Sequence, residues 1–191
     1  MHTRRFAALC LGLWVGLTVA MLFVATQNLT GVDRLLEAPT PAASRIIDRL
    51  GPDAARQFLR FQVSELNRYL FGIYGIGQLF MAALVALSLL FATNANRWVL
   101  GVSLGLIVVV IVQRFVLYPE ITYLGRLLDF VPSTSPQPAR DRFWSFHVAF
   151  SISEVVKLLL MALIGAKLLI RYENRRRILP NEPAGKTAAA A

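Results

Sequence analysis

The chain has 191 residues, enough for one ordinary domain, and 56% of them are hydrophobic while only 16% are charged. Soluble domains carry roughly 25% charged residues. This composition, with a mean hydropathy of +0.56, argues against an ordinary soluble domain and indicates an integral membrane protein. The formal net charge of +9 does not point to nucleic acid, because the basic residues lie beside and between apolar stretches, where they contact lipid headgroups.

Four apolar stretches are long enough to cross a bilayer as α-helices, namely residues 6–26, 69–92, 98–118 and 143–170. The first holds 21 residues, which extend over about 31 Å at 1.5 Å per residue and match a hydrocarbon core of roughly 30 Å. A cleaved signal peptide is the alternative for this stretch, although its apolar part exceeds the about 7–15 residues of such peptides. The pattern predicts an all-α, four-helix membrane bundle within residues 1–177 and a disordered tail at 178–191.

The connections between these spans differ in length and character. Residues 27–68 form a loop of mixed charge, within which Gly51-Pro52-Asp53 opens a stretch with apolar residues at helical spacing. This stretch predicts an amphipathic helix that lies against the bundle or the headgroups and runs into the second span. Residues 93–97 predict a tight hairpin. Pro119 is expected to end the third span, and the proline-containing loop that follows is predicted to be irregular.

The distribution of basic residues favours an orientation with both termini in the cytoplasm. An even number of spans places the termini on one side, where eight basic residues lie against nine on the other. Arg4 and Arg5 flank the first span and three consecutive arginines, 175–177, follow the last, whereas the long first loop dilutes its charge.

Ionisable side chains are rare inside a bilayer and carry a functional hypothesis by default. His147, Ser151 and Glu154 follow one another at i, i+4 and i+7 on one face of the fourth span. Lys157 comes three residues later, and Arg114 lies near the end of the third span, on the side where the fourth begins. Pairing of Glu154 with either cation predicts a structural role, and a proton or cation relay is the alternative. Arg114 is also close enough to the boundary to snorkel.

Other site types find no support in the residues. One cysteine, Cys10, and two distant histidines, His2 and His147, provide neither a metal site nor a pair of haem ligands. We find no phosphate-binding glycine loop, dinucleotide fingerprint, metalloprotease motif or nucleophile elbow. The sequence therefore predicts no cofactor, no metal and no enzymatic activity.

Two small-residue motifs predict close helix packing, because glycine lets two backbones approach. They are Gly12-x-x-x-Gly16 in the first span and Gly101-x-x-x-Gly105 in the third. The partner helix belongs either to the same chain or to a second copy in a homodimer.

Three short pieces of sequence carry a resemblance to a known family. They are Leu13-Trp14-Val15-Gly16, Pro119-Glu120-Ile121-Thr122, and Asp141 through Ser151, which contains Arg-Phe-Trp-Ser-Phe-His. With four spans and a long first loop, the chain resembles the family of transmembrane protein 205 and its bacterial relatives, a domain of unknown function. The resemblance implies a four-helix membrane bundle and brings no reaction or catalytic residues. Where that family has a small polar amide seven residues after the histidine, this chain has Glu154.

Three functions remain open at this point. The first expectation is a non-enzymatic accessory or scaffold bundle in the lipid bilayer, acting as a homodimer or with a membrane protein partner. The alternative is a small transporter or permeability factor, whose polar cluster around Glu154 handles protons, ions or an amphipathic solute. A membrane enzyme or redox partner is the third.

Overall fold

The computed structural model describes residues 2–91, 97–132 and 135–178, and within these ranges the chain is almost entirely helical. The helices in order are α1 (His2–Glu37), α2 (Pro41–Leu50), α3 (Pro52–Leu90), α4 (Arg97–Val112), the π-helix η1 (Gln113–Leu117), α5 (Tyr118–Leu128) and α6 (Pro138–Ile178). The predicted all-α four-helix bundle is confirmed. Apart from Arg97 and Ile178, the predicted hairpin at 93–97 and the predicted tail lie outside the described residues.

Four helical segments are long and apolar enough to cross a membrane: Arg5–Glu37, Pro52–Leu90, Arg97–Leu128 and Pro138–Leu168. Their outer faces are apolar, as shown by the exposed fractions of Leu9 (69%), Phe80 (64%), Phe115 (63%) and Leu159 (60%). A surface of this kind is favourable in contact with hydrocarbon and unfavourable in contact with water.

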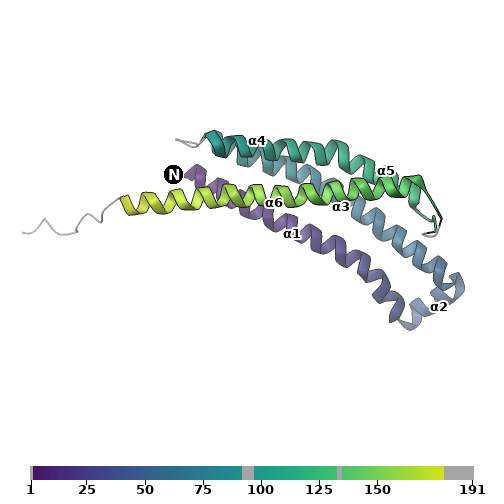
Figure 1. The fold of residues 1–191 in the computed structure, drawn as a ribbon. Helices are drawn as coiled ribbons and strands as arrows, with labels where there is room; N and C mark the ends of the chain where they lie inside the picture. Colours follow the sequence, from purple (N-terminus) through teal and green to yellow (C-terminus); the bar gives the residue numbers. More distant parts are fainter. Residues whose placement is uncertain (1, 92–96, 133–134, 179–191) are drawn as a thin grey trace, which may run out of the picture.

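The four long segments pack side by side as a four-cornered bundle (Figure 1). α1 contacts α3 and α6, and α4 contacts the same two helices, so α1 faces α4, and α3 faces α6, across the bundle axis. Trp14, Val85, Leu106 and Ile164 come from the four corners and are almost fully buried, which places the apolar core between them. The beginning of α1 and the end of α6 lie at one end of the bundle, and α2 lies at the other.

Three helices extend far beyond what a bilayer requires. α1 has 36 residues, α3 has 39 and α6 has 41, which correspond to about 54 Å, about 58 Å and about 61 Å. The prediction that residues 27–37 belong to a loop was therefore wrong, because α1 continues to Glu37. The predicted amphipathic stretch from Pro52 does run into the second span without interruption.

Polar contacts join the end of α1 to the beginning of α3. Asn28 donates to Asn67 at 2.8 Å, and Asn67 donates to the Ala25 carbonyl at 3.3 Å. Asp33 and Arg60 form an exposed ion pair at 3.5 Å. Hydrogen bonds of this kind suit the headgroup region and the water beyond it, where apolar packing is weaker.

Pro119 does not end the third helix, contrary to the expectation from sequence. The backbone widens into the π-helix η1 immediately before it, with the Tyr118 N–H donating to the Gln113 carbonyl. A wider turn gives the proline ring room near the carbonyl four residues earlier, where a regular α-helix would produce a clash. Pro119 then occupies the first turn of α5, where a missing N–H breaks no helical hydrogen bond. The chain is thus helical to Leu128.

A network of charged side chains closes the bundle at the end of α5. Arg68 makes two hydrogen bonds of 2.9 Å to Asp129, and its side chain is only 13% exposed. Glu65 accepts hydrogen bonds from Arg68 at 2.5 Å and from two nitrogens of Arg126 at 3.1 Å. Two cations and two anions balance here, and they fix the end of α5 against α3.

Candidate functional site

Glu154 and Lys157 form an ion pair at the centre of the bundle. Their side chains are 4% and 0% exposed, and Lys157 Nζ lies 2.6 Å from Glu154 Oε1. The residues stand at i and i+3 on α6, which places them on one helical face. A carboxylate or an ammonium alone would be strongly unfavourable in this position, so each group stabilises the charge of the other.

Polar side chains of α3, η1 and α6 itself surround the ion pair. Lys157 also donates to Gln78 of α3, and to Gln113 of η1 and Tyr74 of α3 at 3.4 Å each. The Gln113 amide donates to Glu154 at 3.2 Å and to Ser153 at 2.7 Å. The ion pair is therefore surrounded by amide and hydroxyl groups that satisfy its remaining hydrogen-bonding capacity.

The cluster reaches α1 through a short chain of hydroxyl groups. The Tyr74 hydroxyl donates to Thr18 at 2.8 Å and lies 3.4 Å from Glu154 Oε2. Thr18 donates in turn to the Trp14 carbonyl one turn earlier, at 3.0 Å. Because Tyr74 extends from α3 towards α6, it links the two helices that face each other diagonally. All four corners of the bundle thus contribute to one polar cluster, formed by Thr18, Tyr74, Gln78, Gln113, Ser153, Glu154 and Lys157.

The π-helix explains how two successive residues, Gln113 and Arg114, both point towards neighbouring helices of the bundle. Gln113 is 2% exposed and faces α6, while Arg114 turns towards α3 and is half-buried. The wide turn changes the angle between neighbouring side chains from that of a regular α-helix, and π-turns of this kind recur at functional sites. The local backbone is therefore part of the site.

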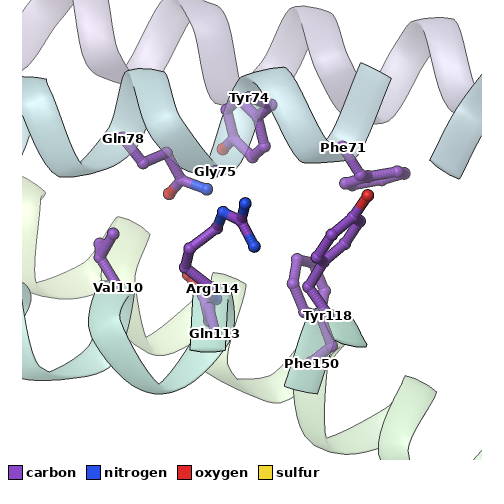
Figure 2. A pocket seen from close by; sticks show the side chains of 9 residues that line it. All are labelled: Phe71, Tyr74, Gly75, Gln78, Val110, Gln113, Arg114, Tyr118 and Phe150. Carbon is purple, nitrogen blue, oxygen red and sulfur yellow. The ribbon is translucent and has the colours of Figure 1, made fainter. Parts of the chain in front are cut away.

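Arg114 contributes to a small pocket beside the cluster (Figure 2). The guanidinium extends from η1 towards α3, between Gln78 and the ring of Phe71. Gly75 provides the room, since a Cβ atom there would come within 2.7 Å of Arg114 Cδ. The complete lining is Phe71, Tyr74, Gly75, Gln78, Val110, Gln113, Arg114, Tyr118 and Phe150.

The structure separates the residues that the sequence placed together. It pairs Glu154 with Lys157, whereas Arg114 has no ion pair with Glu154. His147 and Ser151 are exposed and stay outside the cluster. His147 packs against aromatic rings of its own helix, and Ser151 donates to the His147 carbonyl at 2.9 Å. The face they share with Glu154 is uncovered near the start of α6 and covered only further along.

The glycines that matter for packing are not the ones in the small-residue motifs. A Cβ atom added at Gly12, Gly16, Gly101 or Gly105 would meet nothing within 4 Å, so these positions do not bring two of the described helices together. The faces that carry them are open. Close contacts occur instead at Gly72 with Tyr118, at Gly75 with Arg114, and at Gly125 with Arg68, at 2.7–3.0 Å from the added atom.

Five members of the cluster were not predicted from the sequence: Thr18, Tyr74, Gln78, Gln113 and Ser153. A usable signal existed only for the two glutamines, since each is the one amide side chain in its apolar stretch. A hydroxyl on a membrane helix carries no comparable signal, because it can bond its own backbone four residues earlier. Among the described residues, no group of three or more His, Cys, Asp or Glu side chains could hold a metal ion.

Four apolar helices and a charged cluster that is satisfied inside the bundle define an integral multi-pass membrane protein. The chain belongs to the family described as Domain of unknown function (DUF4149), whose model matches residues 9–126. The match covers α1 to α5, so Thr18, Tyr74, Gln78, Gln113 and Arg114 lie within it, whereas Glu154 and Lys157 of α6 lie beyond it. No curated protein and no solved structure matches the chain.

Proposed function

We propose that this protein is a non-enzymatic accessory or scaffold component of its membrane. In this role the four-helix bundle anchors a helical extension, formed by the end of α1, α2 and the start of α3, for contact with a membrane protein partner. The proposal extends the resemblance to the transmembrane protein 205 family, which implies a bundle of this kind without a reaction.

The observation that carries the proposal is the uncovered amphipathic helix at the tip of the extension. α2 has no buried residue, and its apolar side chains Ile46 and Leu50 are 59% and 56% exposed. Arg45 and Arg49 lie beside them and are also exposed. Apolar and basic side chains on one short helix suit a surface that docks against another membrane component.

A photo-crosslinking experiment in the native membrane tests this role. A photoreactive amino acid at Ile46 is expected to produce a discrete protein adduct. Ile76 of α3 is the matched control, because it is the same residue type with the same exposed fraction of 59%, within an apolar span. That position should react with lipid alone. Lipid adducts alone at both positions would contradict the scaffold role.

A small transporter or permeability factor is the second candidate. The buried pair of Glu154 and Lys157, with the pocket beside it, is the observation that favours this function. The hydrogen-bonded side chains around the pair would then have to exchange partners during transport. Proton or ion flux in reconstituted vesicles that disappears in Glu154→Gln would favour the transporter over the scaffold.

Two further features belong to the proposal. Both termini lie in the cytoplasm, which is the orientation that the arginines flanking the first and last spans favour. The glycines Gly12, Gly16, Gly101 and Gly105 have open space around them, so they are available to a second copy of the chain in a homodimer.

A further inference from the structure

Among the described residues, Arg114 has no counter-ion, whereas the other charges inside the bundle are paired. Lys157 is matched by Glu154 at 2.6 Å, and Arg68 is matched by Asp129 at 2.9 Å. Within the described part of the chain, none of the ion pairs at 4.0 Å or less includes Arg114. One positive charge is therefore left over.

Arg114 lies within a helical segment that is long and apolar enough to cross a membrane. It lies 17 residues after Arg97 and 14 before Leu128, hence about 25 Å and about 21 Å from the two ends of the segment. Its guanidinium lies over the rings of Tyr118 at 5.2 Å and Phe115 at 5.7 Å. Ring faces attract a cation but do not neutralise it, and an unpaired charge inside a membrane-spanning segment is unfavourable.

The surroundings of Arg114 form a site with chemical specificity. Gly75 leaves space for the side chain, as a Cβ atom there would meet Arg114 Cδ at 2.7 Å. Tyr74 and Gln78 contribute polar groups to the same pocket, while Phe71 and Phe150 form its apolar part (Figure 2). A planar guanidinium presents a fork of N–H donors that matches the geometry of a carboxylate or phosphate.

We propose that Arg114 and this pocket bind an oxyanion, a carboxylate or a phosphate, which supplies the negative charge that no described residue provides. The cavity of the pocket is only about 10 Å³, the size of one water molecule, so the anionic group would bind at its open side against the half-buried guanidinium. An attached alkyl chain would then lie along the exposed apolar surface near Phe115, which is 63% exposed. The anion comes either from an amphiphile of the bilayer or from solution. The site is independent of the scaffold role, because binding here does not involve α2.

Titration of the full-length protein in a mild non-ionic detergent tests the site, with dodecyl phosphate and inorganic phosphate as separate probes. Dodecyl phosphate is expected to raise the thermal unfolding temperature in a saturable manner. Arg114→Gln should weaken the apparent affinity by about tenfold or more, and Arg114→Lys should weaken it less, since lysine keeps the charge but not the fork. Lys167→Gln is the control, because it removes another basic residue of a membrane-spanning helix, one that lies over Trp98 at 5.9 Å.

The two probes distinguish an amphiphile from a free anion, and a second variant, Gly75→Val, tests the site independently of Arg114→Gln. Stabilisation by dodecyl phosphate alone identifies an amphiphile as the source of the anion, and equal stabilisation by inorganic phosphate identifies a free anion. Gly75→Val places a branched side chain against Arg114 and should abolish binding even where Arg114→Gln does not yield folded protein. Stabilisation by neither probe, or affinity unchanged in Arg114→Gln or in Gly75→Val, overturns the proposal.

Discussion

The contribution of Glu154 and of Lys157 to the stability of the bundle depends on their pairing. Both side chains are buried in the bundle, and their hydrogen bonds run to Gln78, Gln113 and Tyr74. Breaking a buried pair by removal of one partner is more destabilising than removal of both, because one charge remains without compensation. The cluster therefore acts as a unit, in which the choice of partner specifies how α6 sits against α3 and η1.

A double-mutant cycle measures this coupling. Glu154→Gln and Lys157→Met are each expected to reduce the free energy of unfolding by about 3–5 kcal/mol, since each leaves one buried charge unpaired. The double variant removes both charges and should recover a large part of that loss. Unfolding in mixed detergent micelles gives the four free energies, and coupling close to zero would contradict the paired state.

Arg114 supplies the control for this cycle. It carries the same charge as Lys157 but forms no ion pair with Glu154 in the structure. The combination of Arg114→Gln with Glu154→Gln should therefore show much weaker coupling than the combination with Lys157→Met. Equal coupling in the two cycles would mean that Glu154 shares its charge between both cations.

At the scale of the helical elements, sequence periodicity predicted the four spans but not their ends. Long charge-poor stretches identify membrane helices because the bilayer requires them, and this requirement ends at its surface. α1 continues to Glu37 past that limit because α3 packs beside it, and a tertiary contact of this kind leaves no local signal. Pro119 was misleading because a π-turn accommodates its ring, and a proline in a sequence does not show whether such a turn will form.

The site was predictable to the extent that charge inside a bilayer is informative. Glu154, Lys157 and Arg114 stood out from the sequence for that reason, and all three face the interior or line its pocket. Helical spacing alone could not decide that His147 and Ser151 are exposed, because exposure depends on where the neighbouring helices lie. The spacing of Gly12 and Gly16, and of Gly101 and Gly105, likewise predicted close helix packing at positions whose surroundings are open.

Close approach between α3 and the third membrane segment depends on Gly72. A Cβ atom there would lie 2.8 Å from the Tyr118 hydroxyl oxygen, which donates to the Arg68 carbonyl at 2.9 Å. Gly72→Ala is expected to displace the Tyr118 ring and lower the free energy of unfolding by about 1–3 kcal/mol. Gly77→Ala on the same helix is the matched control, because nothing lies within 4 Å of its added atom.

The control variant should be as stable as the wild type or slightly more stable, because alanine favours a helix more than glycine does. Thermal unfolding of both variants in detergent gives the comparison. Equal stability of Gly72→Ala and Gly77→Ala would show that Tyr118 moves aside without cost.

At the scale of the whole molecule, the two ends of the bundle differ in structure. One end holds the beginning of α1 and the end of α6, and the other holds α2 and the extension that carries it (Figure 1). The scaffold role requires the extension to face a compartment where its partner resides. The side of the membrane on which α2 lies therefore decides which compartment the partner must occupy.

Cysteine labelling determines this side. In a Cys10→Ala background, single cysteines at Ala42, an exposed residue of α2, and at Thr187 should react with a membrane-impermeant maleimide from opposite faces of sealed membranes. An even number of spans requires this opposition, because α2 follows one crossing and the C-terminal tail follows four. The arginines at 4, 5 and 175–177 favour cytoplasmic termini, so Ala42→Cys should label on intact cells and Thr187→Cys only after permeabilisation. Labelling of both positions from one face would overturn the four-span arrangement, and the reverse pattern would keep the spans and invert the orientation.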